Sequence, residues 1–298
     1  MKAISIHLTD RCNNSCKFCV VNSYKEKKEG INKKVIFNFL EENKNEGYEC
    51  VNIHGGEPTI DDNFLDIVKY IKKSGYAHIS VQTNGRTAKD KEYAKKMIEE
   101  GVDLFVISLH SIDEDVNAWI TGDEACLRET IEGIKNIKEL GAKIRTNTVV
   151  CKQNEEELLS IFKFIVEELH VDHINISAMH PTGKAYENFE IVTPRLTHII
   201  PYVKEGIDYI KSTNTIVTLE GFPSCLLGSY KDYLIDWDNN DYKLLYHTFI
   251  LNNYDQFMRD QARHLSSHCG ECSVKDECGG LYKEYIEFYG WEEVRSTV

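Results

Sequence analysis

Strand-like and helix-like segments alternate through the first part of this chain. Six short segments are predicted as strands: residues 3–8, 50–53, 78–82, 104–109, 142–150 and 173–178. Segments with apolar residues at helical spacing lie between them, over residues 33–45, 63–73, 89–100, 127–140 and 155–168. Each interval is long enough for a parallel crossover through a helix. The pattern predicts an α/β fold built as a partial (β/α)6 barrel, because a closed eight-unit barrel would need two more strands.

The alternation ends after Gly183. Residues 194–212 have helical spacing, residues 216–219 are predicted as extended, and the remainder is irregular, aromatic and cysteine-bearing. We therefore expect a barrel domain over residues 1–190 and a C-terminal region over residues 191–298.

Composition and charge exclude several classes of protein. Hydrophobic residues make up 42% and charged residues 28%, which is globular rather than disordered composition. No apolar run approaches the roughly 20 residues of a membrane helix, and residues 1–11 show no export signal. The net charge of −13 disfavours nucleic acid as a partner, and the basic group Lys25–Lys34, interrupted by Glu26 and Glu29, is predicted as a solvated helix face.

Ten cysteines are unevenly placed in the chain. Three lie within residues 12–19 and three within residues 269–278. Without an export signal we expect a cytoplasmic, reducing environment, where disulfides are rare and clustered cysteines indicate metal.

The first cysteine cluster reads Cys12-Asn-Asn-Ser-Cys16-Lys-Phe-Cys19. Three thiolates on one short loop can hold three irons of a [4Fe–4S] cluster and leave the fourth iron without a protein ligand. Zinc sites usually draw four ligands from two separated pairs, so they match the triplet less well. Chance cysteines in a loop are the remaining alternative.

The position of this triplet after the first strand of a βα series, with Phe18 directly before Cys19, resembles the radical S-adenosylmethionine (radical SAM) superfamily. The resemblance implies that the open iron binds S-adenosylmethionine (SAM). SAM is then cleaved to methionine and a 5′-deoxyadenosyl radical, which removes a hydrogen atom from the substrate. It also implies an electron donor such as flavodoxin or ferredoxin.

The segment Gly55-Gly56-Glu57-Pro58 follows the second predicted strand and is similar to the family's Gly-Gly-Glu-Pro motif. Glycines let the backbone approach closely, and nearby carbonyls together with Glu57 can meet an ammonium group. The resemblance implies that this turn binds SAM.

Three further strand ends carry candidate residues. Gln82 and Asn84 close the third strand and can reach the SAM ribose or form only a turn. Ser108 ends the fourth strand, and by resemblance it would hold the SAM carboxylate. His110 shares its strand face, where it reaches substrate or is a satisfied polar residue. Met179 begins the turn Met179–Gly183, which resembles the family's Pro-x-Gly turn, whose backbone meets the adenine.

The fifth predicted strand alternates between two faces. One face carries residues suited to packing under helices, namely Ile144, Thr146, Thr148 and Val150. Arg145 and Asn147 lie on the other face and are candidates for the SAM site, with a structural ion pair to a glutamate as the rival interpretation for Arg145. Cys151, just past the strand on that face, is either a hydrogen-atom donor or a buried structural cysteine.

The second cysteine cluster comprises Cys269, Cys272 and Cys278, and Cys225 can complete four ligands. A zinc site with the same cysteines is one possibility. The spacing resembles the SPASM and twitch extensions of radical SAM enzymes and predicts one auxiliary [4Fe–4S] cluster. Tyr282 stands where the next cysteine of a full SPASM pattern would be. If Cys225 lies elsewhere, an open iron could take a substrate thiolate.

Three functions are consistent with these features. The resemblance favours modification of a ribosomally made peptide by crosslinking, epimerisation or oxidation. Because the first predicted strand begins by residue 3, leader recognition would need a separate peptide-binding protein or the barrel rim. A small-molecule epimerase or dehydrogenase, for example one acting on a sugar, is the alternative. A non-catalytic metal-binding module is disfavoured because it has no use for a SAM site.

Overall fold

The computed structural model describes residues 2–24, 30–235, 241–247 and 249–294. Nine strands form one sheet: β1 (Lys2–Thr9), β2 (Cys50–Gly55), β3 (His78–Thr83), β4 (Leu104–Ser108), β5 (Lys143–Val149), β6 (His173–Ser177), β7 (Ile216–Glu220), β8 (Asp241–Tyr246) and β9 (Phe249–Leu251). The helices of the barrel are α1 (Lys33–Asn43), α2 (Phe64–Lys73), α3 (Lys91–Glu100), α4 (Glu114–Thr121), α5 (Cys126–Glu139), α6 (Leu158–Glu167), α7 (Lys184–Glu187), α8 (Phe189–Val192) and α9 (Leu196–Lys211). After them come α10 (Ser224–Leu227), α11 (Tyr254–Phe257) and α12 (Lys283–Tyr289), with the short strands β10 (Arg263–His264) and β11 (Leu281–Tyr282).

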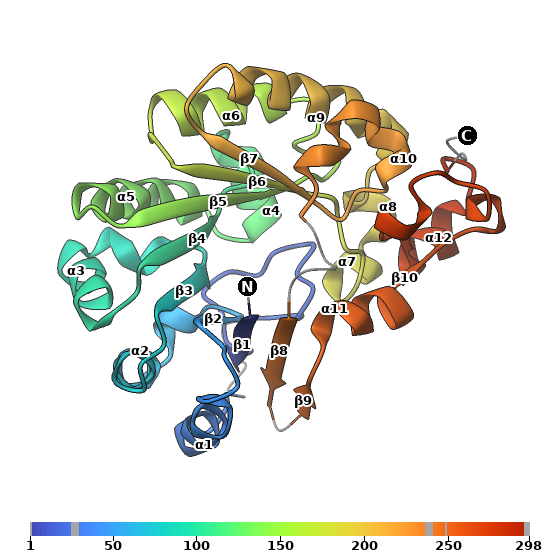
Figure 1. Ribbon diagram of the computed structural model, residues 1–298. Helices are drawn as coiled ribbons and strands as arrows, with labels where there is room; N and C mark the ends of the chain where they lie inside the picture. The colour runs from blue at the N-terminus through green and yellow to red at the C-terminus, as the bar shows by residue number, and fades with distance from the viewer. Residues whose placement is uncertain (1, 25–29, 236–240, 248, 295–298) are drawn as a thin grey trace.

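The sheet has the order β7-β6-β5-β4-β3-β2-β1-β8-β9, and every pairing from β7 to β8 is parallel. It curves with its main helices on the outside (Figure 1). This confirms the predicted α/β partial barrel, and β7 lies in the segment that was predicted as extended. β8 instead falls in the region predicted to be irregular; that prediction was wrong, because β8 pairs with β1 along its whole length.

The predicted boundary near residue 190 stays a prediction. β7 lies beyond it and yet pairs with β6, so the sheet itself continues past that residue.

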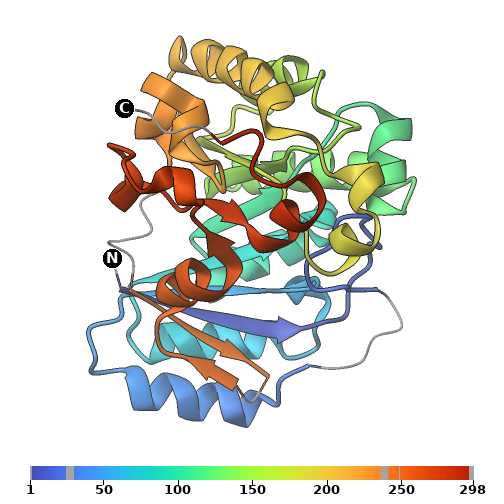
Figure 2. The same cartoon turned by 90° about the vertical axis from the view of Figure 1, so that its right-hand side faces the viewer.

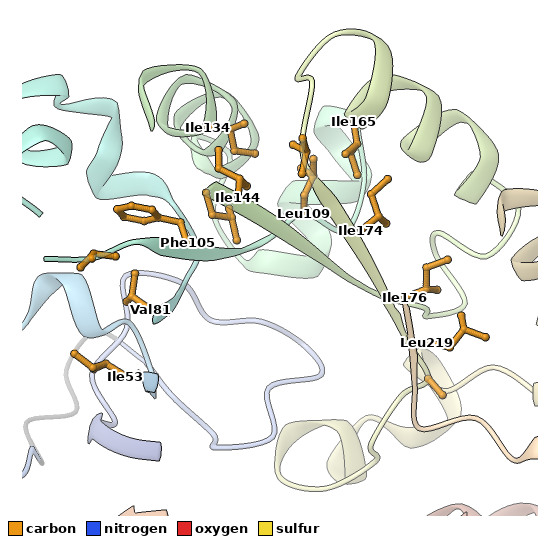
Figure 3. Packing of buried hydrophobic residues seen from close by; sticks show 14 of the residues in the cluster. Ile53, Val81, Phe105, Leu109, Ile134, Ile144, Ile165, Ile174, Ile176 and Leu219 are labelled. Atoms are coloured by element: carbon orange, nitrogen blue, oxygen red, sulfur yellow. The ribbon is translucent and has the colours of Figure 1, made fainter. Parts of the chain in front are cut away.

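The outer face of the sheet forms the core with the helices. Along β5 the predicted face is confirmed, since Ile144, Thr146 and Thr148 are buried and alternate with partly exposed residues. Figure 3 shows Ile134 of α5 and Ile165 of α6 packed on strand residues such as Ile144 and Ile174. Burial of each such aliphatic side chain contributes about 1.5–3 kcal/mol.

The segments after β9 lie on the right-hand side of the barrel in Figure 1, the side that faces the viewer in Figure 2. β10 and β11 pair there as a short antiparallel ribbon. Aromatic contacts join this region to the barrel helices: Phe288 of α12 stacks on Phe189 of α8 at 3.9 Å, and the hydroxyl of Tyr285 accepts a hydrogen bond from the backbone N–H of Leu196. Within the described residues, no helix combines the length and apolar character needed to cross a membrane.

Candidate active site

The cysteine loop leaves the carboxyl end of β1 and is fixed by backbone hydrogen bonds to the end of α4. The N–H groups of Ser15 and Lys17 donate to the carbonyls of Thr121 and Ile120, each at 2.8 Å. Two backbone N–H groups point at sulfur: Asn14 donates to Cys12 Sγ at 3.4 Å and Ser23 donates to Cys19 Sγ at 3.3 Å. N–H groups of this kind stabilise thiolates that ligate iron.

The thiols of this loop lie in an environment that opposes negative charge. Burial, reinforced by the Glu57 carboxylate, raises the pKa of Cys12 to about 12. Burial also raises the pKa of Cys16 well above its usual value, and neighbouring Cys19, Cys12 and Cys126 add to the increase. Thiolates gathered here need a positive partner, which iron provides, so the residues fit an iron–sulfur cluster.

Arg86, the residue after the Asn84-Gly85 turn, clamps the cysteine loop from the side of β3. Its Nη1 donates to the Asn13 carbonyl at 2.8 Å and to Asn14 Oδ1 at 2.6 Å. Its Nε donates to Glu129 of α5 at 2.7 Å, and Asp123 lies 3.1 Å from Nη1. The sequence interpretation missed this residue. No local sequence signal identifies it, because Asn13 and Asn14 lie 73 and 72 positions earlier in the chain.

The Gly55-Gly56 turn packs against the backbone that leads into the cysteine loop. A Cβ on Gly55 would lie 2.4 Å from the Thr9 carbonyl oxygen, and one on Gly56 would lie 2.4 Å from that of Arg11. The Gly56 N–H donates to the Thr9 carbonyl at 2.6 Å. The glycines are therefore required by contact with β1 and its loop, independently of any bound group.

Glu57 is completely buried beside that turn. Its carboxylate accepts hydrogen bonds from the Thr59 N–H and hydroxyl, the Thr83 hydroxyl and the Asn84 N–H, at 2.5–3.1 Å. Pro58 begins the short 3-10 helix η1 (Pro58–Ile60) that presents Thr59. These four donors couple the end of β2 to the end of β3. The expected contact of Glu57 with an ammonium group stays a prediction.

At the end of β3, Asn84 contacts the cysteine loop, whereas Ser108 at the end of β4 lies on the inner face of the barrel. The side chain of Asn84 donates to Asn13 Oδ1 at 2.7 Å, beside Cys12. Gln82 is exposed. Ser108 is half-buried at the end of β4, opposite Asn147 of β5. Their expected contacts with SAM stay predictions.

An apolar group including Phe18, Cys151 and Met179 lies beside the cysteine loop. Cys151 is fully buried, and burial raises the pKa of its thiol to about 12. Val149, the last residue of β5, packs on the same group. This agrees with a buried structural cysteine, and hydrogen-atom donation by Cys151 stays a prediction.

His110 is held within the protein. Its Nδ1 accepts a hydrogen bond from the Val149 N–H at 3.2 Å, and its ring meets that of Phe18 edge-on at 5.0 Å. Burial lowers the pKa of His110 to about 4. The lowered pKa favours the neutral imidazole, and contact of His110 with substrate stays a prediction.

The turn after β6 closes over the cysteine loop. A Cβ on Gly183, whose φ is +60°, would lie 2.6 Å from the carbonyl oxygens of Cys19 and Val20. Next to it, Lys184 Nζ donates to Ser15 Oγ at 2.8 Å. The predicted contact of this turn with adenine stays a prediction, whereas its contact with the cysteine loop is direct.

The inner faces of β5, β6 and β7 carry a polar network. Asn175 Nδ2 and Ser177 Oγ both donate to Asn147 Oδ1 at 2.8 Å, and Asn175 also donates to Glu220 at 3.2 Å. Thr218 Oγ1 donates to Asn175 Oδ1 at 2.7 Å. Glu220, at the carboxyl end of β7, was missed by the sequence interpretation because its strand lay outside the six predicted units.

Arg145 lies one inward-facing position closer to the amino ends of the strands than Asn147. It pairs with Val106 and His173, whereas Asn147 pairs with Ser108. Its buried Nε has no hydrogen-bond partner among the described residues, so the structure gives no support to an ion pair with a glutamate at that nitrogen. Its contact with the SAM carboxylate stays a prediction.

The second cysteine set converges in space. Cys225, Cys269, Cys272 and Cys278 line a single cavity between α10 and the β10–β11 region. The Gly280 N–H donates to Cys278 Sγ at 3.4 Å, and Ser266 Oγ lies 3.5 Å from Cys269 Sγ. Cys225 therefore lies with the other three, as the four-ligand hypothesis requires.

Comparison with known proteins adds a family and a fold. A family model described as the Radical SAM superfamily matches residues 6–165. A probable GTP 3′,8-cyclase of Saccharolobus islandicus is 35% identical over 186 residues, covering 61% of this chain and 58% of the relative. A protein of the same name from Sulfurisphaera tokodaii is 32% identical over 209 residues, covering 70% and 65%. The chain thus spans less than two thirds of the length of these relatives.

Two solved structures share the fold. Streptococcus suis SuiB bound to S-adenosylmethionine superposes with a TM-score of 0.71 at 19% identity, covering 99% of this chain and 76% of SuiB. The protein anSMEcpe with bound AdoMet gives a TM-score of 0.55 at 18% identity, covering 73% and 64%. At these identities the likeness concerns the fold alone.

Proposed function

The chain belongs to the radical SAM superfamily, and from that premise we propose that it removes a hydrogen atom from a peptide and thereby crosslinks, epimerises or oxidises one of its residues. Members of this family bind a [4Fe–4S] cluster and SAM, which together supply hydrogen-atom abstraction. The protein's own part is to hold these groups, orient the substrate and exclude water.

In this proposal Cys12, Cys16 and Cys19 ligate three irons, and the N–H groups that point at their sulfurs stabilise the thiolates. Arg86 and Asn84 hold the loop in place. A reduced flavodoxin or ferredoxin is the proposed electron donor.

The SAM pocket would lie along the carboxyl ends of β2 to β5. We assign the backbone of Gly55 and Gly56 and the side chains of Ser108 and Asn147 to this pocket, because they lie at the ends of strands that border the cysteine loop. Glu57 acts by positioning, since its carboxylate is already occupied by four donors.

We assign Cys225, Cys269, Cys272 and Cys278 to one auxiliary [4Fe–4S] cluster with four protein ligands. Their common cavity supports this assignment, and zinc bound to the same sulfurs is the alternative.

The observation that carries the peptide assignment is the chemistry of the inner face. Asn147 and Thr218 are partly exposed on this face and are neutral donors and acceptors like peptide groups, and Glu220 adds a negative charge at the carboxyl end of β7. Asn175 and Ser177 are buried and hold these side chains by hydrogen bonds. Among the described inward-facing residues of the nine-stranded sheet, arginine and lysine occur only at Lys143 and Arg145, towards the amino ends. Arg263 of β10 lies near the carboxyl end of β7, where it donates to the Gly221 and Gly280 carbonyls. A triphosphate would need several cations near the reacting end.

Cyclisation of GTP is the second candidate, because the two curated relatives bear that name and their matches cover 61% and 70% of this chain. A small-molecule epimerase or dehydrogenase remains the third. The test compares 5′-deoxyadenosine release by the reconstituted enzyme with GTP and with any short peptide encoded beside its gene. Faster release with the peptide, together with a mass change in the peptide, would support the proposal. Conversion of GTP to a cyclised product would contradict it.

A further inference from the structure

Three side chains from distant parts of the chain meet at the carboxyl ends of β1 and β8. Asp10 Oδ1 lies 2.6 Å from His7 Nε2, and Asp10 Oδ2 lies 3.5 Å from His247 Nε2. One donor atom from each residue lies within 4.8 Å of the other two. The side chains of His7 and Asp10 are almost completely buried, whereas that of His247 is 31% exposed. His7 and Asp10 therefore form the buried part of the group, and His247 lies on the side that is open to solvent.

Pairing of β8 with β1 creates this group. His7 lies opposite Tyr246 of β8 and opposite His54 of β2, so His247 follows directly after the paired position. His7 alternates with Ile6 and Leu8, which are buried in the core under the helices, and so it faces the inside of the barrel. His247 has a φ of +52°, a conformation that non-glycine residues rarely adopt, and this turn brings its ring within 5.6 Å of the His7 ring.

Two imidazole nitrogens and one carboxylate oxygen are the donor set of open zinc sites, in which a fourth position is left to water or substrate. A tetrahedral site with bonds of about 2.0 Å separates its donor atoms by about 3.3 Å. The 3.5 Å separation between His247 Nε2 and Asp10 Oδ2 already matches that spacing. The 2.6 Å separation between His7 Nε2 and Asp10 Oδ1 is shorter by less than an ångström, so either carboxylate oxygen is within reach of the ion after a small shift. The His54 ring, centred 5.4 Å from that of His7, adds a further imidazole at the edge of the group.

We propose that His7, Asp10 and His247 bind one divalent transition-metal ion of the zinc class, at a site separate from both cysteine sets. The open coordination position faces the barrel interior, where a bound ion would polarise an oxygen of a bound substrate. The metal site rests on its own three ligands and does not depend on which substrate the enzyme takes.

The test measures zinc binding to the holoenzyme after its iron–sulfur clusters have been reconstituted and loosely bound metal has been removed with a chelator. Equilibrium dialysis against zinc, followed by elemental analysis, should give one zinc per chain in addition to the iron. Cobalt should bind in its place and give the visible absorption of a tetrahedral site. Loss of an outer partner of a metal ligand alone typically weakens affinity about 10- to 100-fold, so loss of a direct ligand in His247→Ala should weaken zinc binding by at least about tenfold.

The matched control is His198→Ala, which removes a half-exposed histidine that pairs with Glu155 at 3.3 Å elsewhere on the surface. This variant should bind zinc as the wild type does, and iron content should be the same in all three proteins. A second comparison uses the variant with Cys269, Cys272 and Cys278 replaced by alanine, which should keep the zinc. The proposal is overturned if the wild type binds no zinc, if His247→Ala binds it equally well, or if the zinc is lost with the C-terminal cysteines. In those cases the group is a hydrogen-bonded Asp–His pair without metal.

Discussion

The guanidinium of Arg86 donates to the side-chain oxygen of Asn14 at 2.6 Å, across the space between the end of β3 and the iron-binding loop. Asn14 in turn donates through its backbone to Cys12 Sγ and through its side chain to Cys126 Sγ. One buried cation thus fixes the residue that touches two sulfur atoms. This explains how a loop without regular structure can present its cysteines in a defined arrangement.

Replacing Arg86 with alanine should therefore release iron and destabilise the protein. Breaking a buried ion pair typically costs about 3–5 kcal/mol, and this is an upper limit here because Glu129 keeps Lys89 as a partner and the Asp123 side chain is 33% exposed. Iron content after reconstitution and the free energy of unfolding measure the two effects. Lys89→Ala is the control, since it removes an exposed partner of the same Glu129 and should change stability by at most about 1 kcal/mol. Equal effects of the two variants would contradict the clamp.

Iron stoichiometry tests the two cysteine sets. Anaerobically reconstituted protein should bind about eight irons, as two cubane clusters. Alanine at Cys12, Cys16 and Cys19 should leave about four irons and abolish SAM cleavage. Alanine at Cys269, Cys272 and Cys278 should leave about four irons with SAM cleavage at least partly retained. Zinc in place of iron at the second set, after strictly anaerobic preparation, would exclude the auxiliary cluster.

The SAM pocket is tested by Ser108→Ala. Ser108 is half-buried and its hydroxyl faces the barrel interior, so the change should weaken SAM binding and leave iron content and thermal stability unchanged. Glu57→Gln is the informative comparison, because an amide cannot accept hydrogen bonds from all four donors around it. That variant should lose stability as well as SAM affinity. Normal SAM binding by both variants would show that the pocket is misplaced.

Gly183 and Gly228 form a matched pair for the contact between the β6 turn and the cysteine loop. Their backbones are nearly identical, at φ 60°, ψ −130° and φ 62°, ψ −127°, but a Cβ on Gly183 would clash with the Cys19 carbonyl, whereas no heavy atom lies within 4 Å of a Cβ on Gly228. Gly228→Ala should cost about 1–3 kcal/mol from backbone strain alone. Gly183→Ala should cost more and should also lower iron retention. Indistinguishable unfolding curves and iron contents would argue against this packing.

The buried imidazole of His110 makes stability depend on pH. Its pKa of about 4 in the folded protein lies below the usual value of 6.5, so between these values the unfolded chain binds the extra proton. The contribution of the neutral His110 to the free energy of unfolding is complete above about pH 6.5 and is lost as the pH falls towards 4. Between about pH 7 and pH 5 the loss amounts to about 2 kcal/mol. His110→Gln should reduce this part of the pH dependence in denaturant titrations. An unchanged pH profile in His110→Gln would show that the group is not buried as described.

Much of the barrel could be predicted from local patterns. The spacing of apolar residues identified the strands up to β6 and five of the helices between them, but it did not identify α4, which lies between β4 and α5. Period-two and period-3.6 patterns are properties of short segments. The same applies to the end of α3 at Gly101, where a backbone with φ of +131° suits glycine. The cysteine spacing indicated an iron-binding loop because all three ligands lie within eight consecutive residues.

Other parts of the site have no local signature. The segment Asp241–Tyr246 lies far along the chain from Lys2–Thr9, yet the two pair in register, and only this pairing brings His247 to Asp10. The contact of Arg86 with Asn14 and the common cavity of Cys225 and Cys269 likewise bring together residues that are far apart in the sequence. The sequence alone determined which segments become the strands from β1 to β7 and which loops carry clustered cysteines, since those properties depend on neighbouring residues. Only the tertiary structure decided which distant side chains meet, because those contacts depend on how the sheet curves and how all its helices pack on it.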